Sequence, residues 1–194
     1  MLRIAETRDA AAMADIYRPY VEKTAITFEE ESPSSGEMAS RIARVGSSYP
    51  WLVFEEGDQL LGYAYASKYR ERAAYRWSLE TSVYVREDSR GRGIGSALYG
   101  GLLPLLRELG IVNLYGVITL PNPGSLALHA KFGFVPLCTF PEVGFKSGGW
   151  RDVGWMVLAL RESAAVPDEP LPFPEFARSH SETLREMLAG SDRR

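Results

Sequence analysis

Residues 83–98 read VYVREDSRGRGIGSAL, an apolar run followed by charged residues and by three glycines at every second position. The β-branched run predicts a strand, and the apolar residues after the glycines recur at helical spacing as far as Gly110. Gly91, Gly93 and Gly95 leave the backbone of the connecting corner accessible, because they carry no side chains. The first N–H groups of a helix lack internal partners and lie at the positive end of its dipole, so this corner predicts a phosphate site.

Three phosphate-binding motifs compete for the corner, and a corner that only turns the chain is the fourth alternative. A P-loop needs Gly-Lys-Ser or Gly-Lys-Thr after its glycines, and neither is present. A dinucleotide motif needs the spacing G-x-G-x-x-G and an acidic residue about 20 positions on, whereas this chain has G-x-G-x-G and Asn113 near that place. The third motif, R-x-x-G-x-G, is satisfied by Arg90, Gly93 and Gly95.

With the strand Val83-Tyr84-Val85 before it, this third motif resembles the acetyl-CoA motif of the GCN5-related N-acetyltransferase (GNAT) superfamily. The expected order of elements is similar to that family as well: strand, two helices, three strands, helix, strand, helix and two strands. The resemblance implies an α/β (α+β) fold, in which helices flank a mixed, mostly antiparallel sheet that splays near its middle to admit acetyl-CoA. We expect residues 1–160 to form the acetyltransferase domain, and residues 161–194 to form a proline-rich tail with a short helix.

Composition and charge argue against other function classes. The 194-residue chain is 45% hydrophobic and 24% charged, as in ordinary globular proteins. Its formal net charge of −3 argues against nucleic acid or an anionic membrane as the main partner. The sequence shows no apolar run of the roughly 18 residues that span a membrane and no signal-peptide core, so we expect a cytoplasmic protein. A single cysteine, Cys138, and two histidines suggest no metal-ligand cluster, and we expect no metal.

Acetylation of an amine needs a base, because a free amine is mostly ammonium at neutral pH. Glu80 is the candidate. In the predicted strand it shares one face with Ser82 and Tyr84, while Leu79 lies on the other face. Apolar surroundings would raise the pKa of this carboxyl group and suit it to accept a proton directly or through water. The alternative is a glutamate that faces solvent or pairs with Arg76.

A second segment, LHAKFGF at residues 128–134, is similar to the family's L-Y-x-K-x-G-F segment, with His129 at the position of the tyrosine. That tyrosine usually donates to the sulfur of coenzyme A. The resemblance therefore implies that His129 lies near the thioester, where it protonates the thiolate or contacts the substrate. A hydrogen-bonded structural histidine is the alternative. Asn122 and Ser125 precede the same helix, where we expect an N-cap, and in the family an asparagine here commonly binds the pantetheine arm.

The resemblance also implies that the backbone of the first strand pairs with pantetheine like an added strand, and that an N–H group there is a candidate oxyanion donor. The expected cofactor-binding residues are Val83, Tyr84, Val85, Arg90, Gly91, Arg92, Gly93, Ile94, Gly95, Ser96, Asn122 and Ser125.

Four separated segments are similar to the phosphinothricin acetyltransferase branch of this family: residues 49–53, 74–77, 80–85 and 144–154. Members of that branch acetylate the α-amino group of phosphinothricin, methionine sulfone or methionine sulfoximine, and they are usually homodimers. We expect direct attack of the amine in a ternary complex, because the sequence shows no cysteine nucleophile with a base: Cys138 lies in a predicted late strand. The resemblance also implies a substrate site in which charged side chains clamp an anionic substrate, although a solvated loop is the alternative for the two arginines. The expected substrate-binding residues are Phe28, Arg70, Arg72, Tyr75, Lys146 and Val153.

Two rival functions stay open at this level. One is a GNAT enzyme for another amine, such as an aminoglycoside, a polyamine or a protein terminus, and a basic lining around Arg70 and Arg72 argues against polycations. The other is a non-catalytic module that binds acetyl-CoA, against which the presence of both Glu80 and His129 argues.

Overall fold

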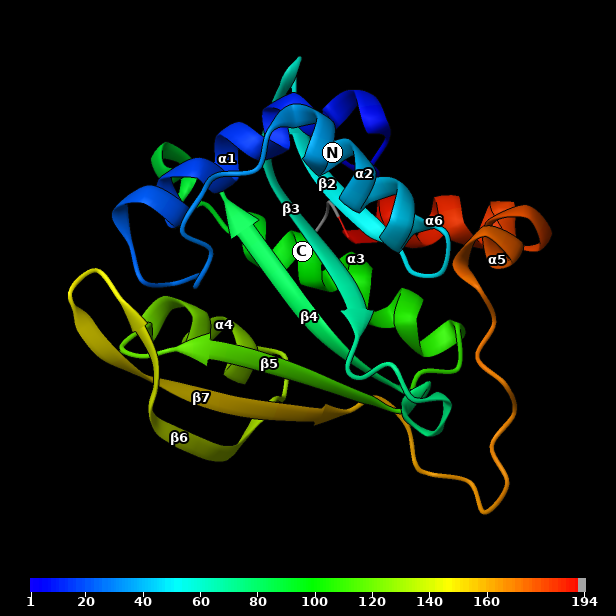
Figure 1. The fold of residues 1–194 in the computed structure, drawn as a ribbon. Coiled ribbons are helices and arrows are strands. Elements are labelled where there is room, and N and C mark those ends of the chain that lie inside the picture. The colour runs from blue at the N-terminus through cyan, green and yellow to red at the C-terminus, as the bar shows by residue number, and fades with distance from the viewer. Residues whose placement is uncertain (192–194) are drawn as a thin grey trace.

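The computed structural model describes residues 1–191 and shows one seven-stranded sheet with helices on both faces (Figure 1). The strand order is β1-β2-β3-β4-β5-β7-β6, and every neighbouring pair is antiparallel except β4 and β5. The predicted mixed, mostly antiparallel sheet is confirmed. The strands are β1 (Leu2–Ile4), β2 (Trp51–Glu56), β3 (Gln59–Lys68), β4 (Ser78–Val85), β5 (Asn113–Thr119), β6 (Val135–Lys146) and β7 (Gly149–Ala159).

Six α-helices accompany the sheet within the described residues. Helices α1 and α2 lie on one face and α3 on the other (Figure 1). None of the helices within residues 1–191 has the length and apolar character that crossing a membrane requires. The helices are α1 (Ala10–Lys23), α2 (Ser35–Gly46), α3 (Ile94–Glu108), α4 (Pro123–Lys131), α5 (Phe173–Ser179) and α6 (Ser181–Ser191).

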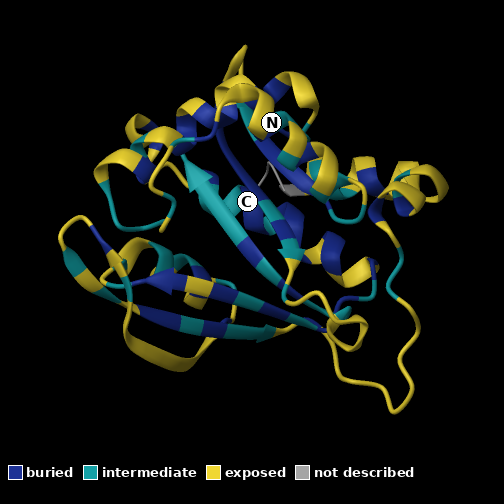
Figure 2. Ribbon diagram, viewed as in Figure 1, coloured by how far each residue is buried: buried dark blue, intermediate teal, exposed yellow. Residues whose placement is uncertain are grey.

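Two apolar cores cover the two faces of β2 and β3, because side chains along a strand alternate between faces. Trp51 and Val53 belong to the core under α1 and α2, whereas Leu52 belongs to the larger core under α3. The burial pattern in Figure 2 follows this arrangement: the central strands carry buried bands, and the outermost strand, β6, is almost entirely exposed. The central strands are therefore fixed from both sides.

The parallel strands β4 and β5 form a fork. They pair at only three positions, the last of which joins Glu80 to Tyr115. Beyond that point β4 stays paired with β3 as far as Val85, and β5 stays paired with β7 as far as Thr119, so the two strands diverge (Figure 1). The splayed sheet that the family resemblance implied is confirmed, and Glu80 lies at the apex of the fork.

The segment after β7 is exposed over residues 161–169 and is attached to the rest of the molecule at a few points before its helices pack against α3. Trp77 donates its indole N–H to Asp168 O at 2.8 Å, and Leu171 N–H donates to Leu109 O at 2.9 Å. The helices that follow bury Phe173 and Phe176 in the core under α3. Two helices occupy the region where the sequence predicts a single short one.

Replacing Phe176 by alanine should lower the free energy of unfolding by about 3–5 kcal/mol, the usual cost of deleting a buried phenylalanine ring. Phe176 is 3% exposed, so the substitution removes contacts with the core and leaves a cavity that water does not fill. Urea denaturation followed by circular dichroism measures the change. Val166→Ala is the matched control, because Val166 is 87% exposed and belongs to the same C-terminal segment. Equal unfolding midpoints for the two variants would show that the C-terminal helices do not contribute to the core.

Candidate active site

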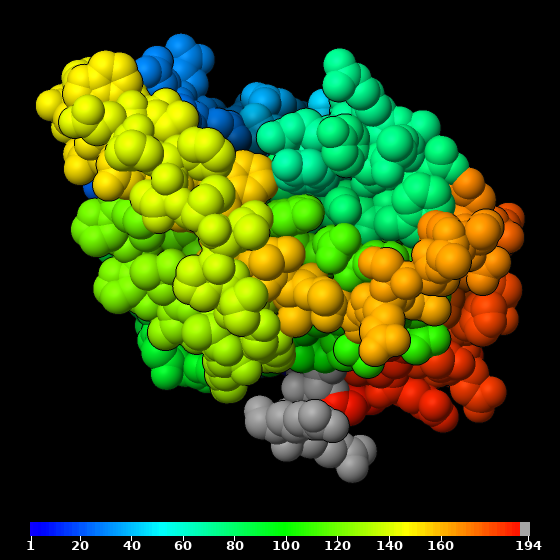
Figure 3. All heavy atoms as spheres, turned by 90° about the horizontal axis from the view of Figure 1, so that it is seen from below, coloured from blue at the N-terminus to red at the C-terminus, as the bar shows by residue number. Residues whose placement is uncertain are grey.

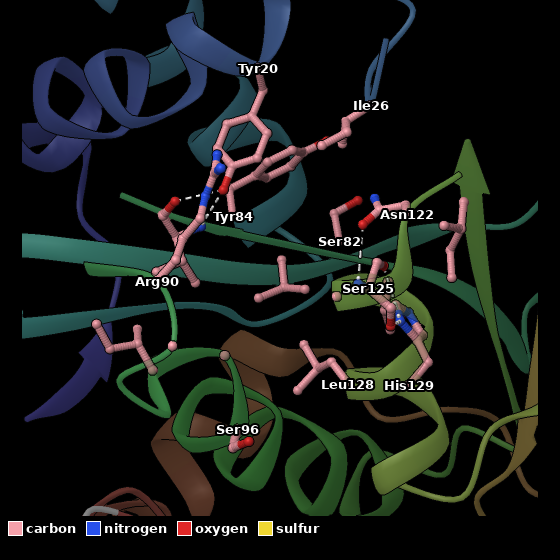
Figure 4. A pocket seen from close by; sticks show the side chains of 18 of the residues that line it. Tyr20, Ile26, Ser82, Tyr84, Arg90, Ser96, Asn122, Ser125, Leu128 and His129 are labelled. Carbon is pink, nitrogen blue, oxygen red and sulfur yellow. Dashed lines mark hydrogen bonds between the residues drawn. The ribbon is translucent and has the colours of Figure 1, made fainter. Parts of the chain in front are cut away.

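A cavity of about 480 Å³ lies in the fork between β4 and β5. Its walls come from the ends of these strands, from the corner before α3 and the first turn of α3, and from the start of α4. Figure 4 shows Tyr20 and Arg90 at one end of the cavity, and Asn122, Ser125 and His129 at the other. The expected cofactor-binding residues that the cavity brings together are Val83, Tyr84, Val85, Arg90, Gly91, Gly93, Ile94, Gly95, Ser96, Asn122 and Ser125.

The backbone of Val83 and Val85 faces this cavity. Arg86 N–H donates to Leu61 O at 2.8 Å, and in an antiparallel ladder every second residue bonds to the same neighbour. Val83 and Val85 therefore direct their N–H and C=O groups away from β3 and into the fork. The Tyr20 hydroxyl satisfies one of these positions, because it donates to Val85 O at 2.6 Å and accepts from Val85 N–H at 3.2 Å.

Tyr20 is a site residue that the sequence did not reveal. It lies on α1, 65 positions before Val85, and its helical spacing marks it only as a core residue. The Arg90 guanidinium packs over the Tyr20 ring, with its central carbon 4.8 Å from the ring centroid. This cation–π contact holds a positive charge at the mouth of the glycine corner.

The glycines of the corner have specific conformational roles. Gly91 and Gly93 have φ angles of 77° and 82°, in the left-handed region that other residues rarely adopt. Gly93 is the N-cap of α3, so the free N–H groups of the first turn follow it directly. A Cβ at Gly95 would lie 3.1 Å from a methyl group of Leu128, so a glycine here lets α3 and α4 approach closely. The corner is built to hold an anion against the backbone.

Arg92 is the one expected cofactor-binding residue that the structure places elsewhere. Its guanidinium pairs with the Glu56 carboxylate at 2.8 Å, and Arg92 does not belong to the cavity wall. The physical reason is the turn at Gly91 and Gly93, which directs residues 90 and 92 to different sides. Only Arg90 lines the cavity.

Glu80 lies at the apex of the fork on the sheet face opposite α3, since its neighbour Leu79 is buried in the core under α3. The Glu80 side chain is 31% exposed, and Arg70 Nη1 lies 3.4 Å from its Oε1. Partial burial raises the pKa of Glu80 above its usual value, while the positive charge of Arg70 opposes the shift. The alternative pairing with Arg76 does not occur, because Arg76 pairs with Glu169.

An aromatic cluster surrounds Glu80 on this face. The rings of Tyr69 and Tyr115 stack with centroids 4.7 Å apart, and Trp155 packs edge-on against Tyr115 at 6.1 Å. The Arg70 guanidinium lies 4.3 Å from the centre of the Tyr69 ring. A partly buried carboxylate with a raised pKa and apolar neighbours suits proton abstraction from an ammonium group.

His129 lines the cavity but is itself 3% exposed, and both ring nitrogens have partners. Nδ1 lies 2.8 Å from Ser125 O, and a carbonyl oxygen can only accept, so Nδ1 carries the proton. Nε2 is then an acceptor, and the hydroxyl of Tyr99 donates to it at 3.0 Å. Burial lowers the pKa of His129 below its usual value, which keeps the ring neutral at pH 7. A Cβ at Gly116 would overlap the ring, so β5 needs a glycine there.

Asn122 is the N-cap of α4. Its Oδ1 accepts from Ser125 N–H at 3.1 Å, so the capping role expected at this position is confirmed. Since the oxygen is used by the helix, the amide NH₂ group is the part of Asn122 that remains for a ligand in the cavity.

The expected substrate-binding residues do not line the cavity. Lys146 is held by backbone groups: its ammonium group donates to Val21 O, Thr27 O and Glu29 O, each at 2.7 Å. These three bonds use all three ammonium protons, so Lys146 fastens the α1–α2 loop to β6 instead of presenting a charge to a substrate.

The remaining expected substrate-binding residues lie outside the cavity, on or near the sheet face that carries Glu80. Phe28, 40% exposed, packs on Gly144, where a Cβ would overlap the ring. Tyr75 packs edge-on against Tyr69, with centroids 5.6 Å apart. Arg72 is exposed, and Val153 is buried in β7 between its partners on β5 and β6.

Comparison with known proteins agrees with this geometry. The family model of the acetyltransferase (GNAT) domain matches residues 2–155. A phosphinothricin N-acetyltransferase from Streptomyces viridochromogenes is 37% identical over 154 residues, which cover 79% of this chain and 84% of that protein. An L-methionine sulfoximine/L-methionine sulfone acetyltransferase from Salmonella typhimurium is 34% identical over 168 residues, which cover 86% and 98% of the two chains.

Among solved structures, a GNAT superfamily phosphinothricin acetyltransferase from Sinorhizobium meliloti in complex with acetyl-CoA superposes with a TM-score of 0.83. It is 38% identical, and the match covers 90% of this chain and 96% of that one. Fold, glycine corner, forked sheet and sequence similarity over most of the chain lead to one conclusion: this chain belongs to the GNAT family of acetyltransferases.

Proposed function

We propose that this acetyl-CoA-dependent N-acetyltransferase acts on the α-amino group of amino-acid-like substrates of the phosphinothricin, methionine sulfone and methionine sulfoximine type. The observation that carries the proposal is Glu80 at the apex of a forked sheet, with the phosphate-binding corner on one side and an exposed arginine, Arg70, beside it. The similarity to enzymes named for these substrates over most of the chain supports the substrate class.

The residues of the cavity fit acetyl-CoA, which supplies the acetyl group as a thioester. The N-terminus of α3 and Arg90 would hold the pyrophosphate. The backbone groups of Val83 and Val85 would pair with the amides of the pantetheine arm, and the Asn122 amide NH₂ would donate to it. The Tyr20 hydroxyl and the pantetheine arm would compete for the N–H and C=O groups of Val85. Tyr20 would therefore lose its two hydrogen bonds to Val85 when the arm binds.

On the other face of the fork, Glu80 would take a proton from the substrate ammonium group, and the resulting amine would attack directly. A backbone N–H near Val83 would donate to the oxygen on which negative charge develops. Arg70 would then exchange its long contact with Glu80 for the carboxylate of the substrate. Phe28, Arg72, Tyr75 and Val153 are proposed to shape the substrate side, with Lys146 holding the loop that carries Phe28.

We also propose that the protein is a homodimer. Six of the eleven exposed large apolar side chains among the described residues lie on β6 and its hairpin with β7, and β6 is an edge strand. This hairpin (yellow in Figure 3) forms one flank of the molecule. The residues are Val135, Leu137, Phe140, Val143, Phe145 and Trp150, each at least 49% exposed. An apolar edge of this kind marks an interaction surface. We further propose a cytoplasmic enzyme without nucleic acid or membrane partners, in keeping with the net charge of −3.

Release of free thiol from acetyl-CoA should occur with phosphinothricin, methionine sulfone and methionine sulfoximine, because each offers an α-amino group beside a carboxylate. A panel that also holds a polyamine and an aminoglycoside serves as the control. Release with the cations alone would refute the proposed substrate class and favour the rival enzyme. If no amine causes thiol release while calorimetry shows that acetyl-CoA binds, the result would favour the non-catalytic module.

Glu80→Gln should lower kcat on the order of 10²–10⁴-fold, the usual contribution of a general base, while the dissociation constant of acetyl-CoA stays nearly unchanged. In the unsubstituted enzyme, kcat/KM should rise with pH through the raised pKa of Glu80, because only the carboxylate accepts a proton. Arg70→Gln should move this rise to higher pH, since the Arg70 charge lowers the pKa. An equal loss of kcat and of acetyl-CoA affinity in Glu80→Gln would mean that Glu80 is structural.

Sedimentation velocity should give a mass of twice the 21.6 kDa chain. Trp150→Glu should shift the protein toward the monomer, because it places a charge in the proposed apolar interface. Val166→Glu is the control, since Val166 is also exposed but lies in the segment after β7. A monomeric wild-type protein at micromolar concentration would contradict the dimer.

A further inference from the structure

A buried chain of hydrogen bonds joins two parts of the cavity wall, Thr81 and His129, through Tyr99, which does not line the cavity. Thr81 Oγ1 lies 3.1 Å from the hydroxyl of Tyr99, and that hydroxyl lies 3.0 Å from His129 Nε2. The chain ends where His129 Nδ1 donates to Ser125 O at 2.8 Å. Thr81 is 7% exposed, Tyr99 0% and His129 3%, so solvent does not compete for these bonds. Three elements that are distant in sequence, β4, α3 and α4, each contribute a member.

The direction of every proton in this chain follows from its last member. Since Nδ1–H of His129 donates to a carbonyl, Nε2 must accept, and Tyr99 must donate to it. The oxygen of Tyr99 is then left as an acceptor for the Thr81 hydroxyl, whose other acceptor, Tyr115 O, is farther away at 3.5 Å. Both hydroxyl protons thus point inward, toward Nε2.

The outer end of the chain meets the reaction point. Thr81 lines the cavity and follows Glu80, the last residue at which β4 pairs with β5. Because neighbouring residues of a strand point to opposite faces, Glu80 and Thr81 flank the apex of the fork from its two sides. An amine nitrogen that attacks a thioester at the apex would have the carboxylate on one side and the Thr81 hydroxyl on the other.

The reaction requires a second proton acceptor besides Glu80. An ammonium group loses two protons when it becomes an amide, and the departing thiolate gains one. Glu80 accounts for one proton only. Glu80 lies beside the cavity, and the described residues of the cavity wall itself include no carboxylate, lysine or cysteine that would take the second.

We propose that Thr81, Tyr99 and His129 form a second proton path, which takes the second amine proton and returns it to the sulfur. As the C–N bond forms, the amine proton passes to Thr81 Oγ1, the Thr81 proton to Tyr99, and the Tyr99 proton to His129 Nε2. As the C–S bond breaks and its electron pair stays on sulfur, the same three transfers run backward and Thr81 protonates the thiolate. This path rests on the proposed function, and it deepens the role of His129.

The protonation state of His129 agrees with such a path. Burial lowers the pKa of the His129 ring. The ring is therefore neutral at rest, and after it accepts a proton at Nε2 it releases that proton readily. The Ser125 carbonyl stabilises the charged ring while it lasts, because it already accepts from Nδ1–H. The imidazole does not have to turn at any step.

Two substitutions interrupt the path without changing the size of a side chain much. Tyr99→Phe removes the middle hydroxyl, and Thr81→Val removes the outer one. Each should lower kcat about 10- to 100-fold, at the lower end of what acid–base groups contribute. Because the two residues act in series, the double variant should lose no more than either single variant. Thr81→Ser keeps the hydroxyl and should retain most of the activity.

Two measurements on the protein without turnover accompany the kinetics. Calorimetry should show that the dissociation constant of acetyl-CoA changes less than threefold in each variant. In the unliganded protein, ¹⁵N NMR should show His129 as the neutral Nδ1–H tautomer, and in Tyr99→Phe the Nε2 resonance should move toward that of an unbonded nitrogen. Tyr63→Phe is the matched control, because Tyr63 is also buried but lies in the core under α1 and α2.

Several results would overturn the path. The first is an unchanged kcat in Tyr99→Phe or Thr81→Val, and the second is a double variant in which the two losses of kcat multiply. The third is a loss of acetyl-CoA affinity with kcat unchanged, which would mean that the hydrogen bonds only hold α4 in place. The rates are measured with whichever amine the wild-type enzyme acetylates, so an error in the substrate class is not mistaken for failure of the path. A wild-type protein that acetylates no amine refutes the proposed function itself.

Discussion

The end of pairing between β4 and β5 after Glu80 and Tyr115 is the constraint on which the site depends. Each strand keeps its other neighbour, so the fork is held open by two intact ladders and not by flexible loops. Backbone groups in a fork must find partners, because an unsatisfied N–H or C=O group costs free energy. The Tyr20 hydroxyl supplies partners at Val85. The remaining edge is an opening shaped for a molecule that can pair like a strand.

The fork also explains how two kinds of chemistry meet at one point. A step of one residue along β4 changes the face of the sheet, so Glu80 and Thr81 have different surroundings. Glu80 lies among aromatic rings and an arginine on the half-open face, where its pKa rises. Thr81 lies against α3 and α4 on the buried face, where the hydrogen bonds of Tyr99 and His129 are shielded from water. The family motif therefore supplies the binding corner, and the strand geometry separates the proton-accepting groups.

Long-range tethers hold the elements around this point. Lys146 binds three backbone carbonyls at the end of α1 and in the loop after it, which offsets the cost of burying its charge. The segment after β7 is attached through Trp77 and Leu171, and its helices complete the core under α3. Because α3 carries both the phosphate-binding corner and Tyr99, the C-terminal helices support the site from behind.

Local pattern was enough to predict the glycine corner before α3, the N-cap at Asn122 and the position of Glu80 on a strand, because periodicity and turn chemistry depend on neighbours in sequence. The fold class followed from the resemblance of the glycine motif and the order of elements to the GNAT family. Local pattern was not enough for Tyr20, Tyr99 or the three carbonyls around the Lys146 ammonium group, since their partners lie 18 to 125 positions away. The pairing of Arg92 with Glu56 was not predicted either, because a left-handed glycine turn decides which way a side chain points. The tertiary structure alone decides which polar groups meet, since a hydrogen bond depends on distances that no local pattern contains.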